Sequence, residues 1–224
     1  MSSWAQSPSV RGQHDRRERM VYVVDDDEPM LRAMEGLLRS SGVCVATFES
    51  LRDFLAHPRR NVPSCLILDV RLRGESGLAF LEQMARHGTH MPIVFITGYG
   101  DVAMTVRAMK AGAVDFFTKP FRDQDMLDAV ANALARDGDR LAAEAANAAL
   151  RQAYASLTPR EREVMGYVVA GLMNKQIAIE MGVSEVTVKI HRGHVMRKMA
   201  ARSVAELVRK AESLGVGLPP SRFS

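Results

Sequence analysis

Val21-Tyr-Val-Val-Asp25-Asp26-Asp27 is the stretch that decides the fold of the N-terminal part of this 224-residue chain. A short apolar run rich in β-branched residues predicts a buried strand. The helical pattern of Pro29–Ser41 follows it and stops at Gly42. The alternation continues, with strands expected at Val43–Phe48, Cys65–Asp69, Pro92–Ile96 and Asp115–Thr118, and helices at Leu51–His57, Gly77–His87, Val102–Ala111 and Asp123–Arg136. This order predicts a doubly wound α/β domain, in which helices cover both faces of a five-stranded parallel sheet.

Polar side chains stand where these strands end. Asp25 and Asp26 follow the first strand, Asp69 ends the third, Thr97 follows the fourth and Lys119 the fifth. The carboxyl ends of parallel strands share one edge of the sheet, and ligands bind there. Clustered carboxylates repel one another unless a cation lies among them, and hard oxygen ligands suit Mg²⁺. A carboxylate such as Asp69 can then accept a phosphoryl group whose charge Mg²⁺ and a lysine neutralise.

Four motifs extend this prediction: Val21-Tyr-Val-Val-Asp-Asp-Asp-Glu-Pro29, Leu66-Ile-Leu-Asp69, Ile96-Thr97-Gly98 and Asp115-Phe-Phe-Thr-Lys119-Pro120-Phe121. Together they resemble a two-component receiver domain of flavodoxin-like fold over residues 20–137. The resemblance implies that Asp69 is the phosphoacceptor and that Mg²⁺ is bound by Asp25, Asp26, Asp69 and the backbone carbonyl of Arg71. It also implies a switch pair, Thr97 and Phe116, and a phosphoryl-binding Lys119. The Lys119–Pro120 bond is a candidate for the cis form, which proline makes accessible.

The loop after Asp69 departs from the receiver pattern. Such domains usually read Asp-x-x-x-Pro-Gly, whereas this chain has Arg73 before Gly74. Loss of the fixed φ of proline makes the loop more mobile and can change the lifetime of the phosphoryl group in either direction.

The segment between the domains is rich in alanine. Residues 138–155 predict a helical linker of high helix propensity. Leu127, Leu134 and Leu141 are spaced for a coiled-coil seam, but Gly138 interrupts them, so both a solvated spacer and a dimer coil stay open. Residues 1–19 and 218–224 are expected to be disordered tails.

The C-terminal segment, residues 156–217, predicts a helix-turn-helix. Thr158 to Glu161 form a capping box before a helix that ends near Ala170. Asn174 is expected to cap a short helix that ends at Gly182, and Ser184 a longer helix that ends near Met199. Two helices joined by so short a turn define the motif.

The longer helix of this motif has two different faces. Val188, His191, Val195 and Met199 form the expected core face, and we favour a structural role for His191. The opposite face, with Lys189, Ile190, Gly193 and Arg197, carries only basic charge. A basic helix face of this kind suits the major groove of DNA.

Three motifs carry the resemblance of this all-α domain: Leu157-Thr-Pro-Arg-Glu-Arg-Glu-Val164, Gly171-Leu-Met-Asn-Lys-Gln-Ile-Ala178 and Val183-Ser-Glu-Val-Thr-Val-Lys-Ile-His-Arg192. They resemble a LuxR-type DNA-binding domain, so the whole chain resembles NarL/FixJ-family response regulators of the FixJ and StyR type. The resemblance implies DNA contacts from Lys175, Thr187, Lys189, Ile190 and Arg192. Gly193 either allows close approach to DNA or has no function there.

Composition and charge exclude several other classes of protein. The chain is 47% hydrophobic and 25% charged, which is typical of a globular protein. Its only cysteines, Cys44 and Cys65, cannot build a disulfide framework or a cysteine-based zinc site. No apolar stretch reaches membrane-spanning length, so we expect a cytoplasmic protein. Residues 20–136 carry 13 basic and 15 acidic residues, whereas residues 156–217 carry 10 and 6, which places the basic charge with the predicted DNA-binding segment.

The function implied by both resemblances is phosphotransfer from a sensor histidine kinase to Asp69, which promotes homodimerisation through the 102–118 region and binding to double-stranded DNA. We also expect a contact with RNA polymerase. We expect no enzymatic activity. One alternative is a phosphorylation-independent DNA-binding regulator. Another is a haloacid-dehalogenase-like phosphatase with Asp25 as nucleophile, but Pro29 and the lack of a following threonine fit its motif poorly.

Overall fold

The computed structural model describes residues 19–86, 90–100 and 102–216 of the chain. The chain divides into two compact units, Met1–Ala142 and Ala143–Ser224. The expected tails at 1–18 and 218–224, and the expected end of a helix at His87, lie outside the described residues.

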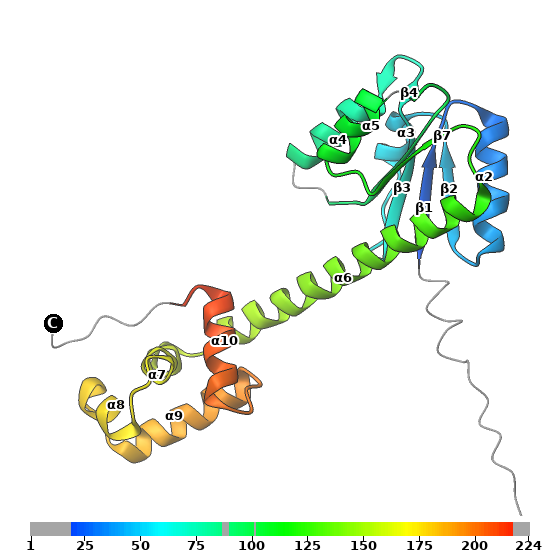
Figure 1. Cartoon of the computed structure of the whole chain (residues 1–224). Helices are drawn as coiled ribbons and strands as arrows, with labels where there is room; N and C mark the ends of the chain where they lie inside the picture. The colour runs from blue at the N-terminus through cyan, green and yellow to red at the C-terminus, as the bar shows by residue number, and fades with distance from the viewer. Residues whose placement is uncertain (1–18, 87–89, 101, 217–224) are drawn as a thin grey trace, which may run out of the picture. The chain divides into compact units, whose positions relative to one another are not determined.

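The first unit is built on a five-stranded parallel sheet (Figure 1). Its strand order is β2-β1-β3-β6-β7, with every neighbouring pair parallel. Every residue of the three central strands is buried, because both faces of the sheet are covered by helices. The strands are β1 (Met20–Val24), β2 (Cys44–Phe48), β3 (Ser64–Asp69), β6 (Ile93–Thr97) and β7 (Asp115–Thr118). The predicted doubly wound α/β fold is confirmed.

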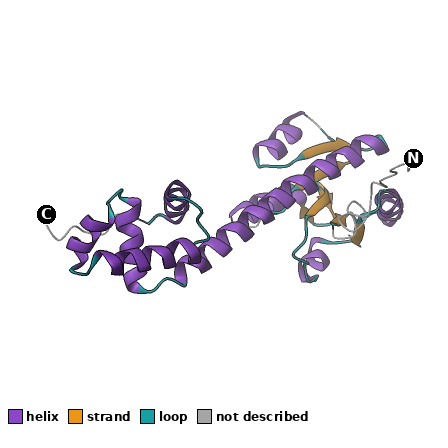
Figure 2. Cartoon of the chain, turned by 90° about the horizontal axis from the view of Figure 1, so that it is seen from below, coloured by secondary structure: helices purple, strands orange, loops and turns teal. Residues whose placement is uncertain are grey.

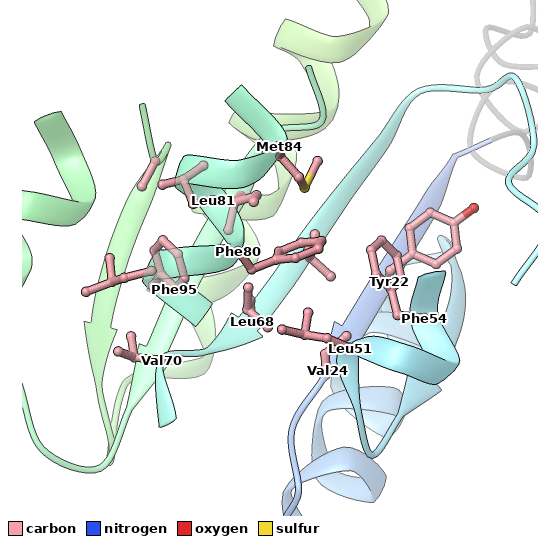
Figure 3. Close-up of a cluster of buried hydrophobic side chains, with 14 of the residues drawn as sticks. Tyr22, Val24, Leu51, Phe54, Leu68, Val70, Phe80, Leu81, Met84 and Phe95 are labelled. Carbon is pink, nitrogen blue, oxygen red and sulfur yellow. The ribbon is translucent and has the colours of Figure 1, made fainter. Parts of the chain in front are cut away.

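Side chains that alternate along the strands supply two cores. Val21 and Val23 belong to a core closed by α2 (Glu28–Ser40) and α6 (Asp123–Ala155). Tyr22 and Val24 belong to the opposite core (Figure 3). That core is closed by α3 (Leu51–Ala56), α4 (Gly77–Arg86) and α5 (Val102–Lys110).

Aromatic contacts organise the second of these cores. The rings of Tyr22 and Phe54 meet edge to face with centroids 5.5 Å apart, and Phe54 meets Phe80 at 6.2 Å. Such pairs contribute about 0.5–1.5 kcal/mol each beyond the burial of their surface. They join β1 to α3 and α4.

A small hairpin next to β3 was not predicted. It pairs β4 (Arg71–Leu72) with β5 (Glu75–Ser76) in antiparallel fashion. Gly74 in its turn has φ 80°, a conformation that glycine adopts without a steric penalty. Strands of two residues carry no periodic signal that a sequence could reveal.

Helix α6 does not stop at Arg136, as we expected, but continues through Gly138 to Ala155, so that it begins in the first unit and ends in the second. The buried carboxylate of Asp137 accepts a 2.8 Å hydrogen bond from the backbone N–H of Ser64 and is paired with Arg140. These contacts offset the cost of about 1 kcal/mol that glycine imposes inside a helix. Leu134 is buried in the core of the first unit, and Leu127 packs against that core. These leucines are therefore not free to form a coiled-coil seam.

The second unit consists of helices in the part that the structure describes (Figure 2). Its core includes Val164, Ile177, Val188 and Leu207, one from each of the four helices that follow α6. The helices are α7 (Pro159–Val169), α8 (Asn174–Met181), α9 (Glu185–Lys198) and α10 (Val204–Leu214), of which α10 was not predicted. None of the described helices is long and apolar enough to cross a membrane.

The helix caps of the second unit are as expected with one exception. Thr158 and Glu161 form the predicted capping box, and Ser184 caps α9. Asn174 was expected to cap α8, but the cap is Met173, and Asn174 is the first residue of the helix. The side-chain oxygen of Asn174 instead accepts a 2.9 Å hydrogen bond from Arg192 of α9.

Candidate functional site

Strand ends gather the acidic residues at the carboxyl edge of the sheet. Asp25 follows β1 and Asp69 ends β3, and the register pairs Val24 with Leu68. Both aspartates are buried, and Asp26 is half-buried. One carboxylate oxygen of each of the three lies within 4.8 Å of the others, so the predicted convergence is observed.

Lys119 places a positive charge between two of these carboxylates. Its Nζ lies 2.6 Å from Oδ2 of Asp25 and 2.7 Å from Oδ2 of Asp69. Its backbone N–H donates to the carbonyl of Thr97, and the Lys119–Pro120 bond is cis, as anticipated. The lysine therefore joins the ends of three strands that are far apart in the sequence.

Burial and pairing shift the pKa values at this edge. Burial raises the pKa of Asp25 above its ordinary value, although hydrogen bonds from Lys119 and Asp27 oppose the shift. Burial alone would lower the pKa of Lys119, but the hydrogen bonds to Asp25 and Asp69 outweigh it and raise that pKa. The lysine is held in its charged form, which the cluster of carboxylates needs.

Backbone amides fix the orientation of two of the carboxylates. The N–H of Asp27 donates to Oδ1 of Asp25 at 2.9 Å, and the N–H of Arg71 donates to Oδ1 of Asp69 at 2.8 Å. Asp26 receives its hydrogen bond from the side chain of Arg73 instead, over 3.0 Å. Each carboxylate keeps acceptor capacity for a hard cation, because an ionised carboxylate has about four lone-pair sites.

Thr97 and Phe116 are the expected switch residues, and Thr97 is linked to this cluster through the backbone of Lys119. Thr97 is fully buried, and its Oγ1 accepts a 3.2 Å hydrogen bond from the N–H of Tyr99. Phe116 is half-buried against the core, with its ring centroid 6.4 Å from that of Phe95. A β-carbon on Gly100 would lie 2.5 Å from the Thr118 side chain and 3.2 Å from the Phe116 ring, so this glycine lets the loop pass close to both residues of β7.

An exposed cation–π pair between Arg71 and Tyr99 was not anticipated from the sequence. The guanidinium of Arg71 lies 5.7 Å from the centroid of Tyr99, whose side chain is 77% exposed. This cation–π contact connects the loop after β3 to the loop after β6. Both residues are bulky and exposed, and neither has a spacing signal that would have singled it out.

Helix α9 of the second unit presents the expected basic face. Val188, Val195 and Met199 are buried in the core, whereas Lys189, Ile190, Gly193 and Arg197 are exposed. Ile190, at 53% exposure, is an apolar side chain of the size that contacts a thymine methyl. His191 is half-buried beside the core.

The other expected DNA-contacting residues occupy different positions. Lys175 is exposed at the start of α8, and Thr187 lies in the first turn of α9 with its hydroxyl 2.8 Å from that of Ser184. Arg192 is partly buried, and its hydrogen bond to Asn174 joins α9 to α8. Its guanidinium keeps further donors for a phosphate or a base.

These features define a class of protein in which a receiver domain with an acidic phosphoacceptor edge precedes a DNA-binding helix-turn-helix unit. The family model "Response regulator receiver domain" matches residues 21–131. The model "Bacterial regulatory proteins, luxR family" matches residues 155–211.

Similar proteins extend over most of the chain. Nodulation protein W of Bradyrhizobium diazoefficiens is 54% identical over 197 residues, which cover 88% of this chain and 87% of that protein. Response regulator protein TodT of Pseudomonas putida is 44% identical over 198 residues, with the same shares. The solved structure of response regulator StyR is 46% identical with a TM-score of 0.80, and the match covers 87% of this chain and 98% of that chain. The chain belongs to the NarL/FixJ family of two-component response regulators.

Membership of this family determines the functional class. The chain is a two-component response regulator with a LuxR-type DNA-binding domain, and its relatives are transcription regulators. A histidine kinase and DNA are the partners that this domain pair implies. The phosphatase alternative, with Asp25 as nucleophile, is not supported.

Proposed function

We propose that Asp69 accepts a phosphoryl group from the phosphohistidine of a sensor kinase in the cytoplasm, and that this modification promotes homodimerisation and promoter binding. The observation that carries the proposal is the position of Lys119, whose ammonium bridges Asp25 and Asp69. A carboxylate next to a fixed cation is suited to attack a phosphoryl group, because the cation neutralises the charge on the phosphoryl oxygens.

The donor set at this edge fits Mg²⁺. Asp25, Asp26 and Asp69 supply clustered carboxylate oxygens, and the backbone carbonyl of Arg71 follows directly in the loop. Mg²⁺ prefers such oxygen ligands and, when bound, neutralises charge on phosphoryl oxygens. Asp25 and Asp26 would hold the ion, and Asp69 would present one oxygen to the incoming phosphorus.

Lys119, Thr97 and Phe116 complete the proposed mechanism. Lys119 would exchange its contact with Asp69 for one with a phosphoryl oxygen. The hydroxyl of Thr97 would turn from Tyr99 toward the phosphoryl group, and Phe116 would move inward after it. We assign the receiver function to residues 20–137 and DNA binding to residues 156–217. Residues 138–155 link the two domains.

Dimerisation is proposed to use α5 and β7. Val102, Val106 and Met109 of α5 are 81%, 43% and 46% exposed, although they are large apolar side chains. An exposed apolar stripe of this kind is typical of an interaction surface. Two DNA-binding units would then engage paired half-sites, where contact with RNA polymerase becomes available.

The test uses the full chain with Mg²⁺ and a small acyl-phosphate donor, followed by intact mass and light scattering. We expect one phosphoryl addition and conversion of monomer to dimer, both abolished in Asp69→Asn. Asp27→Asn is the matched control, because Asp27 is exposed next to the cluster. Equal phosphorylation of Asp69→Asn would contradict the proposal. Phosphorylation without a change in oligomeric state or DNA affinity would favour the phosphorylation-independent regulator.

DNA contacts are proposed for Lys175, Thr187, Lys189, Ile190, Arg192 and Gly193. Selection from a randomised duplex library supplies the DNA probe. Lys189→Ala should weaken binding and, if Lys189 contacts a phosphate, reduce the slope of log affinity against log salt by about one. Arg209→Ala, at an exposed position of α10, should leave both unchanged.

A further inference from the structure

The second unit contains a cluster of metal-ligating side chains to which the proposed function assigns no role. Glu161 of α7 and His191 and His194 of α9 each offer one ligand atom, and these atoms all lie within 4.8 Å of one another. His191 and His194 are three residues apart, so they share one stripe of the helix. Two imidazoles and one carboxylate from two helices form a ligand set, not a cluster of acids alone.

The carboxylate of Glu161 has one oxygen occupied and one directed at histidine. Oε2 accepts hydrogen bonds from the N–H of Thr158 at 2.8 Å and from Nζ of Lys198 at 2.7 Å. Oε1 lies 3.4 Å from Nδ1 of His194. Ligand atoms placed about 2.1 Å from a tetrahedral ion are about 3.4 Å apart, so this pair already has the spacing of two ligands.

His191 has a buried ring nitrogen, Nδ1, that lacks a hydrogen-bond partner among the described residues. Buried polar atoms are nearly always paired, so an unpaired nitrogen on a ring that offers a ligand atom to this cluster indicates a missing partner. The His191 and His194 rings stand at 87° to one another with centroids 6.5 Å apart.

Glu161 supplies negative charge at this position, and His194 supplies access from solvent. Glu161 is 3% exposed, and the hydrogen bond from Lys198, helped by the N–H of Thr158, lowers its pKa to about 2. The carboxylate is therefore ionised at neutral pH. The His194 side chain is 43% exposed and provides the route from solvent.

We propose that Glu161, His191 and His194 bind one divalent transition-metal ion of the zinc type. Imidazole suits Zn²⁺, Cu²⁺ and Ni²⁺, whereas Mg²⁺ and Ca²⁺ prefer sites made of oxygen alone. Three protein ligands leave a coordination position for water. The ion would join α7 to α9, the helix that carries the basic face, and so stabilise the position of that helix.

Zn²⁺ titration of the full-length protein against a chromophoric chelator tests the site. Millimolar Mg²⁺ is kept present so that the oxygen ligands of the first unit do not contribute. We expect one equivalent of Zn²⁺ in the wild type and an affinity at least tenfold lower in His194→Ala, since loss of a ligand costs more than the roughly 10-fold minimum for an outer-shell partner. His90→Ala removes an exposed histidine of the first unit and should bind as the wild type does.

Lys198 provides a variant with the opposite expected effect. Its ammonium competes with the ion for the carboxylate, so Lys198→Met should bind Zn²⁺ several-fold more tightly, which a purely structural role of the cluster would not produce. Co²⁺ absorption of the unaltered protein gives a readout that depends on no variant, and intense visible bands of tetrahedral coordination are expected. Equal Zn²⁺ affinity in the wild type and His194→Ala, or absence of those Co²⁺ bands, would overturn the proposal.

Discussion

Arg73 donates a hydrogen bond from Nε to Oδ2 of Asp26 over 3.0 Å. The side chain of Arg73 is 87% exposed, and that of Asp26 is 28% exposed. The residue that replaces the usual proline therefore places an exposed positive charge on one of the three carboxylates proposed to bind Mg²⁺. An ion bound at this cluster would compete with Arg73 for the negative charge of the Asp26 carboxylate.

Removal of Arg73 should strengthen Mg²⁺ binding. Exposed ion pairs contribute about 0–1 kcal/mol, so Arg73→Ala should raise Mg²⁺ affinity by up to about fivefold. Isothermal titration of the unphosphorylated protein measures the change. Arg60→Ala, at another exposed position of the first unit, serves as the control, and an unchanged affinity in Arg73→Ala would refute competition.

Loss of the Lys119 charge should destabilise the first unit. Lys119→Met leaves the buried carboxylates of Asp25 and Asp69 facing one another without a cation. We expect a loss of about 1–3 kcal/mol in the free energy of unfolding in EDTA, and a smaller loss in millimolar Mg²⁺. Urea denaturation measures both values. Lys110→Met, at an exposed position of α5, should change neither.

Two glycines of the first unit should respond to alanine in opposite directions. A β-carbon on Gly77 would lie 2.5 Å from the backbone oxygen of Asp69, which cannot move aside easily, whereas one on Gly36 would meet no atom within 4 Å. Gly77→Ala should cost about 1–3 kcal/mol. Gly36→Ala, inside α2, should stabilise by about 0.5–1 kcal/mol. Thermal unfolding ranks the two variants, and the same sign for both would contradict the predicted packing at Asp69.

The stability of the second unit should fall in acid because of Glu161. The pKa of this carboxyl is about 2 in the folded chain against 4.5 ordinarily. Its contribution to stability is therefore fully present above pH 4.5 and is lost as the pH falls toward 2. In the presence of a chelator, Glu161→Gln should flatten this part of the pH profile, as followed by hydrogen exchange in α7 and α9. Glu212→Gln, at an exposed position of α10, should leave the profile unchanged.

Gly193 and Gly182 form a second opposed pair. A β-carbon on Gly193 would meet no atom within 4 Å, and the residue lies inside α9, so Gly193→Ala should stabilise by about 1 kcal/mol. Gly182 ends α8 with φ 64°, where alanine should cost about 1–2 kcal/mol. Calorimetry distinguishes the two. Weaker DNA binding by the stabilised Gly193→Ala would show that the glycine serves close approach to DNA.

The edge of the sheet was predictable because strand ends are visible in a sequence. Asp25 and Lys119 are 94 positions apart, yet each directly follows a segment that the sequence predicts to be a strand. A parallel sheet brings such positions to one edge whatever the intervening helices contain. The direct contact of Lys119 with both Asp25 and Asp69 follows from that topology.

Other features depend on tertiary contacts that no local pattern encodes. The continuation of α6 through Gly138 depends on the contact of Asp137 with Ser64, 73 positions earlier. The position of Asn174 depends on Arg192, and the pairing of Asp26 depends on how the Arg73 side chain folds over the loop. Helix propensity and capping preference are local terms, and long-range hydrogen bonds override them.

The hydrogen bond from Ser64 to Asp137 makes the Ser64 amide a reporter of the contact between α6 and β3. Its acceptor belongs to α6, whereas the donor begins β3, the strand that ends at Asp69. The Ser64 N–H can exchange with deuterated solvent only when this hydrogen bond to α6 opens. Its exchange rate before and after phosphorylation would measure directly whether an event at Asp69 loosens the start of the same strand.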